Sequence, residues 1–262
     1  MRGFGWMSLT TDYGTFDGFV AACHGVIARI APDVRVIDIT HHVPPADVPR
    51  GAAVLAQTAP HLPQSVHVAV VDPGVGTARR PVAIGTPNGV LVGPDNGVLI
   101  WAAEALGGID EVVQLVNKDW FLGDMSRTFH GRDLFAPAAA HIAGGAALTD
   151  AGPSVDAQTL VRLPDPVVAV GDGWLEAEVM TVDRFGNVQL AAGGATLAGL
   201  GAELLIGGNV RARRGTTFQD VGQGELLVYE DSAGRVAIAI NGGRAVVVLS
   251  VRPGDVVRIT QR

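Results

Sequence analysis

The chain has almost no cysteine, few aromatic residues and no long apolar run. Cys23 is the single cysteine among 262 residues, so no disulfide can form within the chain, which fits a reducing compartment. No stretch reaches the roughly 18 uninterrupted apolar residues of a membrane span, and the N-terminus lacks the apolar run of a signal peptide. We therefore expect a soluble, cytoplasmic protein with no membrane partner.

Basic residues are also in deficit. The chain carries 19 Lys and Arg against 26 Asp and Glu, a formal net charge of −7. Proteins that bind phosphate backbones normally show a basic excess or a basic stripe. The one basic cluster, Arg211, Arg213 and Arg214, has no interleaved aromatic residue, and we interpret it as a solvated loop. Nucleic acid is therefore not an expected partner.

Small aliphatic residues are abundant instead. Hydrophobic residues make up 48% of the chain although aromatic residues make up only 5%, so the core must be packed from small side chains. In the first half, strand-like and helix-like segments alternate, which predicts an α/β domain with a mostly parallel sheet. The expected strands are 7–10, 34–40 and 66–71, a hairpin joins 82–86 to 90–93, and the expected helices are 16–30, 50–59, 97–106 and 134–143.

Composition changes near residue 160. The segment 162–167 contains two prolines and reads as a linker. Beyond it, short β-type runs punctuated by Gly and Asp predict a small antiparallel sandwich or barrel. These runs are 174–182, 203–206, 225–230, 236–240, 245–249 and 256–259. We expect an α/β domain over 1–162 and a β domain over 168–262.

Two loops combine glycines with titratable groups. Asp72 opens the loop that follows strand 66–71, at the carboxyl end where open α/β sheets bind ligands. The segment 127–133, Arg-Thr-Phe-His-Gly-Arg-Asp, precedes a predicted helix, and a helix N-terminus favours negative charge. Two structural interpretations stay open. Asp72 could bond its own backbone in a tight turn, and Asp133 could cap the helix.

Two further loops offer polar groups to a ligand. Asp12 and Asp17 follow the first strand and could hold a sugar diol, because a carboxylate accepts two hydroxyl bonds. They could equally form a turn and a helix cap. Asp183, Phe185 and Asn187 supply an acceptor, an aromatic face and an amide, which suits a purine and an amino group. The alternative there is a hairpin turn with a bulge.

Several kinds of chemistry lack their sequence signature. The loop after Val71 has neither the Gly-Lys-Ser/Thr of a P-loop nor the G-x-G-x-x-G of a dinucleotide site. No G-x-S-x-G elbow is present. Seven histidines, including the adjacent His41 and His42, occur without H-E-x-x-H or Cys-rich spacing, so we expect no metal. Cys23 lies in an apolar helical run and is expected in the core.

Five motifs occur in order over nearly the whole chain: TDYGTFDG, VDPGVGTARR, PDNG, TFHGRD and VDRFGN. Together they resemble the S-adenosyl-L-methionine hydroxide adenosyltransferase family, which is related to the bacterial fluorinase and chlorinase. The resemblance implies an N-terminal α/β domain and a C-terminal β-barrel. It also implies a homotrimer whose active sites lie between the N-domain of one subunit and the C-domain of its neighbour. The implied substrate is S-adenosylmethionine, the implied product is adenosine, and no cofactor is implied.

The resemblance also implies site residues. Asp72, Arg79 and His130 would handle the water. The implied substrate contacts are Asp12 and Asp17 at the ribose, Phe129 and Gly131 in the second loop, Asp183, Phe185, Asn187 and Ser232 at the methionine and adenine, and Asn241 and Gly242 where backbone meets adenine. Relatives often carry an Asn-Ser pair where this chain has Asp231 before Ser232, which leaves the contacts to the methionine carboxylate open.

The implied reaction begins at the sulfonium, which makes the ribose 5′ carbon electrophilic and leaves as a neutral thioether. Arg79 would stabilise hydroxide character, and either Asp72 or His130 would take the proton. Halide-using relatives have tyrosine-like residues at the positions of Asp72 and His130, so water is the expected nucleophile. Two alternatives stay open: chloride attack, for which Gly131 leaves room but Asp72 is repulsive, and a non-catalytic sensor of adenosine or S-adenosylmethionine.

Overall fold

A computed structural model describes residues 3–262 of the chain. The chain divides into two compact units, Met1–Leu163 and Pro164–Arg262, which we call the N-terminal and C-terminal units. Within residues 3–262, none of the helices is both long enough and apolar enough to cross a bilayer.

The N-terminal unit is built on a six-stranded sheet with the order β2-β1-β3-β5-β4-β6. The strands are β1 (Trp6–Thr11), β2 (Arg35–Thr40), β3 (Ser65–Val70), β4 (Pro81–Thr86), β5 (Gly89–Pro94) and β6 (Glu111–Gln114). β2, β1, β3 and β5 are parallel neighbours, and β4 is antiparallel to β5 and β6. The predicted mostly parallel sheet and the β4–β5 hairpin are confirmed, whereas no sequence pattern marked β6.

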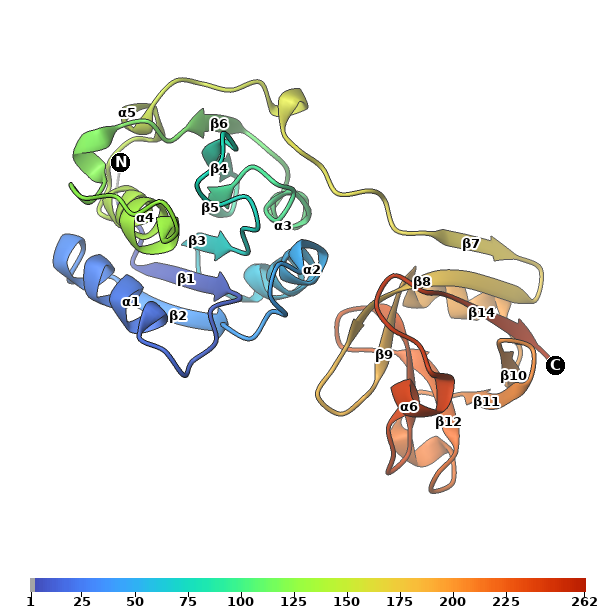
Figure 1. Cartoon of the computed structure of the whole chain (residues 1–262). Helices are drawn as coiled ribbons and strands as arrows, with labels where there is room; N and C mark the ends of the chain where they lie inside the picture. Colours follow the sequence, from blue (N-terminus) through green and yellow to red (C-terminus); the bar gives the residue numbers. More distant parts are fainter. Residues whose placement is uncertain (1–2) are drawn as a thin grey trace. The chain divides into compact units, whose positions relative to one another are not determined.

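Helices cover both faces of this sheet (Figure 1). α1 (Phe19–Ile30) and α4 (Ala136–Ala143) pack together on one face, and α2 (Val48–Thr58) and α3 (Ile100–Ala105) pack together on the other. A short helix, α5 (Leu148–Ala151), follows α4. Because both faces are covered, every residue of β3 is buried, as the near-continuous apolar sequence of 66–71 predicts. Cys23 is buried on α1, also as predicted.

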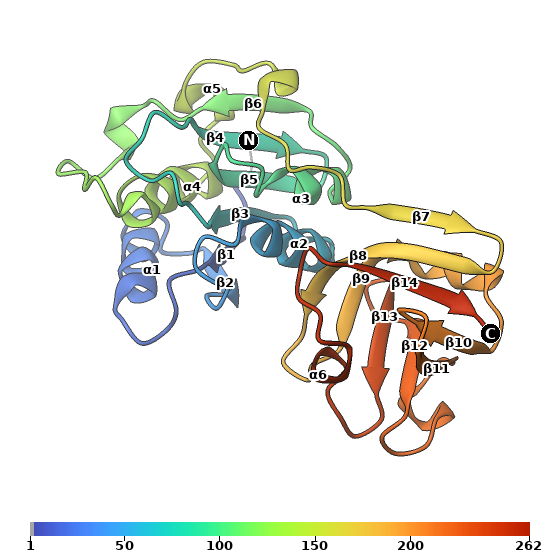
Figure 2. The same cartoon turned by 45° about the vertical axis from the view of Figure 1, so that its right-hand side comes forward.

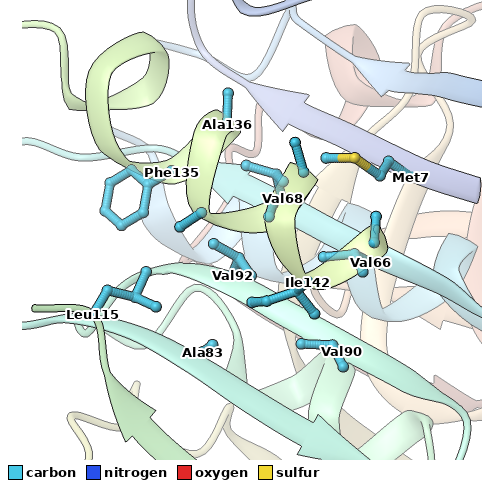
Figure 3. Close-up of a cluster of buried hydrophobic side chains, with 14 of the residues drawn as sticks. Met7, Val66, Val68, Ala83, Val90, Val92, Leu115, Phe135, Ala136 and Ile142 are labelled. Carbon is cyan, nitrogen blue, oxygen red and sulfur yellow. The ribbon is translucent and has the colours of Figure 1, made fainter. Parts of the chain in front are cut away.

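The core under α4 shows how a chain with few aromatics is packed (Figure 3). Five of the eight residues of α4 are alanines, and all five are buried, so the helix axis can approach the sheet closely. Valines of β3 and β5 fill the layer beneath it, beside Met7 of β1 and Ile142 of α4. Phe135, directly before α4, is fully buried in this cluster, and it therefore fixes where the preceding loop ends.

Three helices begin later than the sequence predicts, and α3 starts at Ile100 rather than at residue 97. α1 starts at Phe19 rather than at residue 16, and Phe16 is fully exposed in the preceding loop. α4 starts at Ala136, after a π-helical turn at Gly131–Phe135. Pro137 falls in the first turn of α4, directly after the π-helical turn.

The C-terminal unit is a closed seven-stranded barrel with one extra strand. Its strands are β7 (Val168–Gly171), β8 (Trp174–Val182), β9 (Val188–Gly193), β10 (Glu203–Ile206), β11 (Val210–Arg214), β12 (Leu226–Glu230), β13 (Arg235–Ile240) and β14 (Val256–Gln261). β14 pairs with both β8 and β10, which closes the ring (Figure 2). The predicted barrel is confirmed, and its pairings are antiparallel except for the parallel pair β11–β12.

Two local predictions in this unit are wrong. The valine-rich segment 245–249 is not a strand but a short helix, α6 (Ala245–Leu249), because Val246 N donates to Gly186 O, a turn residue rather than a strand edge. The basic cluster at 211–214 is not a loop but lies on β11. There Ala212 is buried between outward-facing Arg211 and Arg213, which is the period of a strand.

Candidate functional site

Asp72 and Arg79 pair across the loop that leaves β3. Arg79 Nε donates to Asp72 Oδ1 at 3.1 Å and to Oδ2 at 2.9 Å, and Nη2 also donates to Oδ2. The Asp72 side chain is 4% exposed and that of Arg79 is 10% exposed. The carboxylate therefore pairs with Arg79, whereas only the backbone oxygen of Asp72 serves the local turn, by accepting from Val75 N. A pair this buried depends on both members, because either one alone would leave an uncompensated charge.

Arg79 also reaches the second loop. Its Nη2 lies 2.8 Å from Nδ1 of His130. A guanidinium has no acceptor, so Nδ1 must accept this hydrogen bond, and the neutral imidazole then carries its proton on Nε2. Burial and the Arg79 charge lower the pKa of His130, which favours the neutral ring. The structure thus brings Asp72, Arg79 and His130 into one hydrogen-bonded chain that ends in an N–H donor.

Two glycines allow the loops to pack this closely. A Cβ atom on Gly76 would lie 2.6 Å from the carbonyl oxygen of Arg127, and the backbone of Gly76 has a φ of +78°. A Cβ atom on Gly131 would overlap the Tyr13 hydroxyl. Glycine is therefore needed at both positions, at Gly76 for space and conformation and at Gly131 for space alone.

The second loop is held from inside by Asp133. Its side chain is fully buried, pairs with Arg132 and accepts from Ser126 N at 2.8 Å. One interpretation of the sequence made Asp133 the cap of the following helix. That interpretation is wrong, because Asp133 lies inside the π-helical turn Gly131–Phe135 and does not cap α4. π-helical turns are frequent at functional sites. This one places His130 at the entrance of the turn, and Phe135 at its end lies under the Arg79 guanidinium, 5.1 Å from ring centroid to Cζ.

The loop after β1 brings Asp12 and Tyr13 to the same region. Asp12 Oδ2 accepts from Ala46 N at 2.9 Å, and the Tyr13 ring meets Phe129 edge-on at 5.6 Å. Burial raises the pKa of Tyr13 strongly, and the nearby Cys23, Asp12 and Asp72 raise it further.

The same loop contains a predicted site residue that lies at the surface and a second residue that sequence reasoning missed. Asp17 is exposed. Tyr13 was assigned no role, although it stands between the two aspartates of the TDYGTFDG motif. Its contact with Gly131 joins two motifs that lie more than a hundred residues apart, and no spacing rule could have shown that contact.

In the C-terminal unit, the Asp183 side chain is engaged within its own turn. Oδ1 accepts from the backbone N of Phe185 and of Asn187, each at 2.9 Å, and Oδ2 accepts from Asn187 Nδ2 at 2.8 Å. The structural interpretation of this segment as a β8–β9 turn is correct for Asp183. Phe185 is 65% exposed, with the Arg184 guanidinium 5.3 Å from its ring centroid, so its ring lies at the surface of the turn.

The remaining predicted residues lie on two other turns of the barrel. Ser232 is exposed at the β12–β13 turn, which Asp231 closes by accepting from the backbone N of Ala233 and Arg235. Asn241 Nδ2 donates to Val221 O at 2.9 Å, and Gly242 has a φ of +76°. These turns present backbone and short polar side chains.

A separate cavity of about 340 Å³ lies in the N-terminal unit. Its lining includes Gln64 and Gly89, where β3 and β5 begin, but none of the predicted site residues. In open α/β sheets the functional edge is the one where strands end, which is where Asp72 lies. We therefore assign the site to the loops of Asp72 and His130.

Comparison with known proteins agrees with the motifs. Models of the SAM hydroxide adenosyltransferase N-terminal and C-terminal domains match residues 7–152 and 177–258. The (R)-S-adenosyl-L-methionine hydrolase of Salinispora arenicola is 62% identical over 257 residues, 97% of each chain. A fluorinase of an Actinoplanes species is 28% identical over 290 residues, also 97% of each chain. The crystal structure of a conserved protein of Thermotoga maritima matches with a TM-score of 0.91 at 36% identity, over 97% of this chain and 100% of that one.

Proposed function

The chain belongs to the S-adenosyl-L-methionine hydroxide adenosyltransferase family, and from that premise we propose that it hydrolyses S-adenosyl-L-methionine to adenosine and L-methionine. The observation that carries this proposal is the hydrogen-bonded chain of Asp72, Arg79 and His130. It offers a carboxylate, a fixed cation and an N–H donor, which are the groups needed to orient a water and stabilise developing hydroxide.

In the proposed reaction, water forms a bond from its oxygen to the ribose 5′ carbon as the bond from that carbon to sulfur breaks. The electron pair goes to sulfur, which leaves as a neutral thioether, and the water loses one proton. Neutral His130 uses Nδ1 to accept from Arg79 and has a proton on Nε2, so it can donate to the water but cannot take its proton. We therefore assign proton acceptance to Asp72, whose Oδ1 accepts a single hydrogen bond from Arg79 and retains a free lone pair.

Chloride as the nucleophile is the competing reaction, since fluorinases are more distant relatives. The buried Asp72 carboxylate would repel a bound halide. The test incubates the pure protein in ¹⁸O-labelled water with each sulfonium epimer of S-adenosylmethionine, with and without chloride. We expect unlabelled methionine, together with adenosine that carries ¹⁸O at its 5′ hydroxyl. We also expect faster hydrolysis of the (R) epimer of S-adenosylmethionine, which is the substrate in the name of the Salinispora arenicola relative. Formation of 5′-chloro-5′-deoxyadenosine would replace the proposal with a halogenase, and binding without turnover would replace it with a sensor.

The pH dependence tests the role of neutral His130. Because its pKa is lowered, the ring stays neutral down to below its usual value of about 6.5. We expect kcat to decrease with falling pH only below pH 6.5, because Nδ1 of His130, once protonated, can no longer accept a hydrogen bond from Arg79. His130→Asn keeps an acceptor near the Nδ1 position and cannot be protonated there, so its residual activity should lose this acid limb. An identical acid limb in the variant would assign the titration to another group.

The resemblance supports three further proposals. We propose that the protein acts in the cytoplasm as a homotrimer, so its mass by light scattering should be three times that of the chain.

We propose that Asp12 and Asp17 contact the ribose, with Phe129 and Gly131 beside the reacting carbon. We propose that a neighbouring subunit contacts the methionine and adenine through Asp183, Phe185, Asn187, Ser232, Asn241 and Gly242.

A further inference from the structure

Three side chains of metal-ligand type lie close together near the end of β2. None of them belongs to the hydrogen-bonded series formed by Asp72, Arg79 and His130. His24 lies on α1, Asp38 on β2, and His41 directly after β2. His24 Nε2 is 2.8 Å from Asp38 Oδ1, and His41 Nε2 is 3.1 Å from the same oxygen. One ligand atom from each of the three lies within 4.8 Å of the others. The fold creates this cluster, and the spacing along the sequence does not show it.

His41 supplies a second, independent observation. Its side chain is 4% exposed, and its Nδ1 lies 2.8 Å from Thr11 Oγ1. Its Nε2 is buried and makes no hydrogen bond to any group in residues 3–262, although it lies 3.1 Å from Asp38 Oδ1. A buried polar atom without a hydrogen bond is costly and needs an explanation. Here it faces a carboxylate and a second imidazole.

The three ligands suit a metal of the zinc class. Zn²⁺ binds His nitrogen and Asp oxygen at about 2.0–2.2 Å, so ligand atoms in a tetrahedral site lie about 3.4 Å apart. The separations of 2.8 and 3.1 Å between Asp38 Oδ1 and the two Nε2 atoms need to widen by a few tenths of an ångström, and the ligand atoms of the two histidines lie within 4.8 Å of each other. The side chains of His24 and Asp38 are 35% and 42% exposed, so they are free to make that movement while His41 stays fixed.

We propose that His24, Asp38 and His41 bind one divalent transition-metal ion of the zinc class. The two imidazoles would bind through Nε2 and the carboxylate through one oxygen, and water would complete the coordination on the exposed side. Two nitrogen ligands disfavour Mg²⁺ and Ca²⁺, which prefer oxygen. Thr11 Oγ1 would accept from Nδ1 of metal-bound His41, the supporting contact that orients a ligand imidazole.

The proposed ion would stabilise the loop after β1. His41 O accepts from Gly14 N at 2.7 Å, and Thr11 Oγ1, which contacts the His41 ring, also accepts from Tyr13 N at 3.2 Å. One cavity of only about 10 Å³ is lined in part by Thr11, Tyr13, His41 and Gly131. Little free space therefore separates these four residues. An ion that fixes the His41 ring therefore restrains the loop that packs against Gly131, without contacting the reacting atoms.

The test uses the full-length protein after dialysis against a chelator. Titration with Co²⁺ should give visible ligand-field bands that saturate at one ion per chain and disappear on addition of Zn²⁺. Zn²⁺ should also raise the thermal unfolding midpoint in proportion to the logarithm of its excess over Kd. His24→Ala and Asp38→Asn should each weaken Co²⁺ binding by at least about 100-fold, the upper range for loss of a mere supporting contact.

The matched control is His42→Ala. His42 is adjacent to His41, but its ring lies 3.3 Å from Thr15 Oγ1 and is not in the cluster, so Co²⁺ binding should be unchanged. Circular dichroism establishes that each variant is folded. The proposal is overturned if the wild-type protein binds no stoichiometric Co²⁺ or Zn²⁺, or if His24→Ala and Asp38→Asn bind as tightly as wild type. Equal weakening in His42→Ala would indicate nonspecific histidine binding and would also overturn it.

Discussion

Arg79→Ala is expected to lower kcat for adenosine release by at least about 10²–10³-fold, the usual cost of removing one preorganised donor from a site where charge develops. Arg79 is the central residue of the hydrogen-bonded series Asp72–Arg79–His130, since it donates to both Asp72 and His130. Its loss removes the fixed positive charge, frees the His130 tautomer and leaves Asp72 as an unpaired carboxylate. The measurement is the steady-state rate of adenosine formation at saturating S-adenosylmethionine.

The same substitution should destabilise the protein, so a matched control is needed. Breaking a buried ion pair costs about 3–5 kcal/mol, and the next residue offers a comparison: Arg80 Nη2 lies 2.6 Å from Asp95, and the side chains of Arg80 and Asp95 are 31% and 3% exposed. Arg80→Ala should lower the free energy of unfolding to a similar extent while kcat changes little. If the two variants lose activity equally at a temperature where both are folded, Arg79 acts through stability and the proposed role is wrong.

The sequence places Asp72 and His130 on two candidate loops of an α/β fold, and the resemblance to the family assigns Asp72, Arg79 and His130 as a set. Asp72 directly follows a continuous apolar strand, and such strands end at the functional edge. His130 precedes a helix on an adjacent loop. What the sequence does not contain is the partner of each group. The bond from Arg79 to Nδ1 of His130, which decides what the imidazole can do, depends on two loops meeting in space.

Tertiary contacts also explain where local patterns mislead. Val246 and its neighbours have strong strand propensity, but they lie against the β8–β9 turn through Gly186 and form α6, since propensity yields to packing. His24, Asp38 and His41 come from a helix and a strand whose packing no spacing rule describes. The layered architecture, by contrast, follows from alternation of strand and helix patterns over long segments, and it was predicted correctly.

Gly131→Ala should lower both the stability of the protein and its rate of turnover. The backbone of Gly131 is helical, a conformation that any residue adopts, so the whole effect comes from space: the new Cβ would overlap the Tyr13 hydroxyl. We expect a loss of stability of about 1–3 kcal/mol, typical of overpacking. We also expect kcat to fall by about 100-fold, because displacement of the adjacent His130 by about 1 Å misplaces a catalytic group.

A rescue experiment separates this steric cause from a general one. Tyr13→Phe removes the hydroxyl that the new methyl group meets, so the double variant Tyr13→Phe, Gly131→Ala should recover part of both the stability and the kcat that Gly131→Ala loses. Gly123→Ala serves as the control, since a Cβ atom at this exposed position meets nothing within 4 Å and should leave both quantities near wild type. A double variant no better than Gly131→Ala, in a double-mutant cycle of unfolding free energies and rates, would show that the contact with Tyr13 is not what requires glycine there.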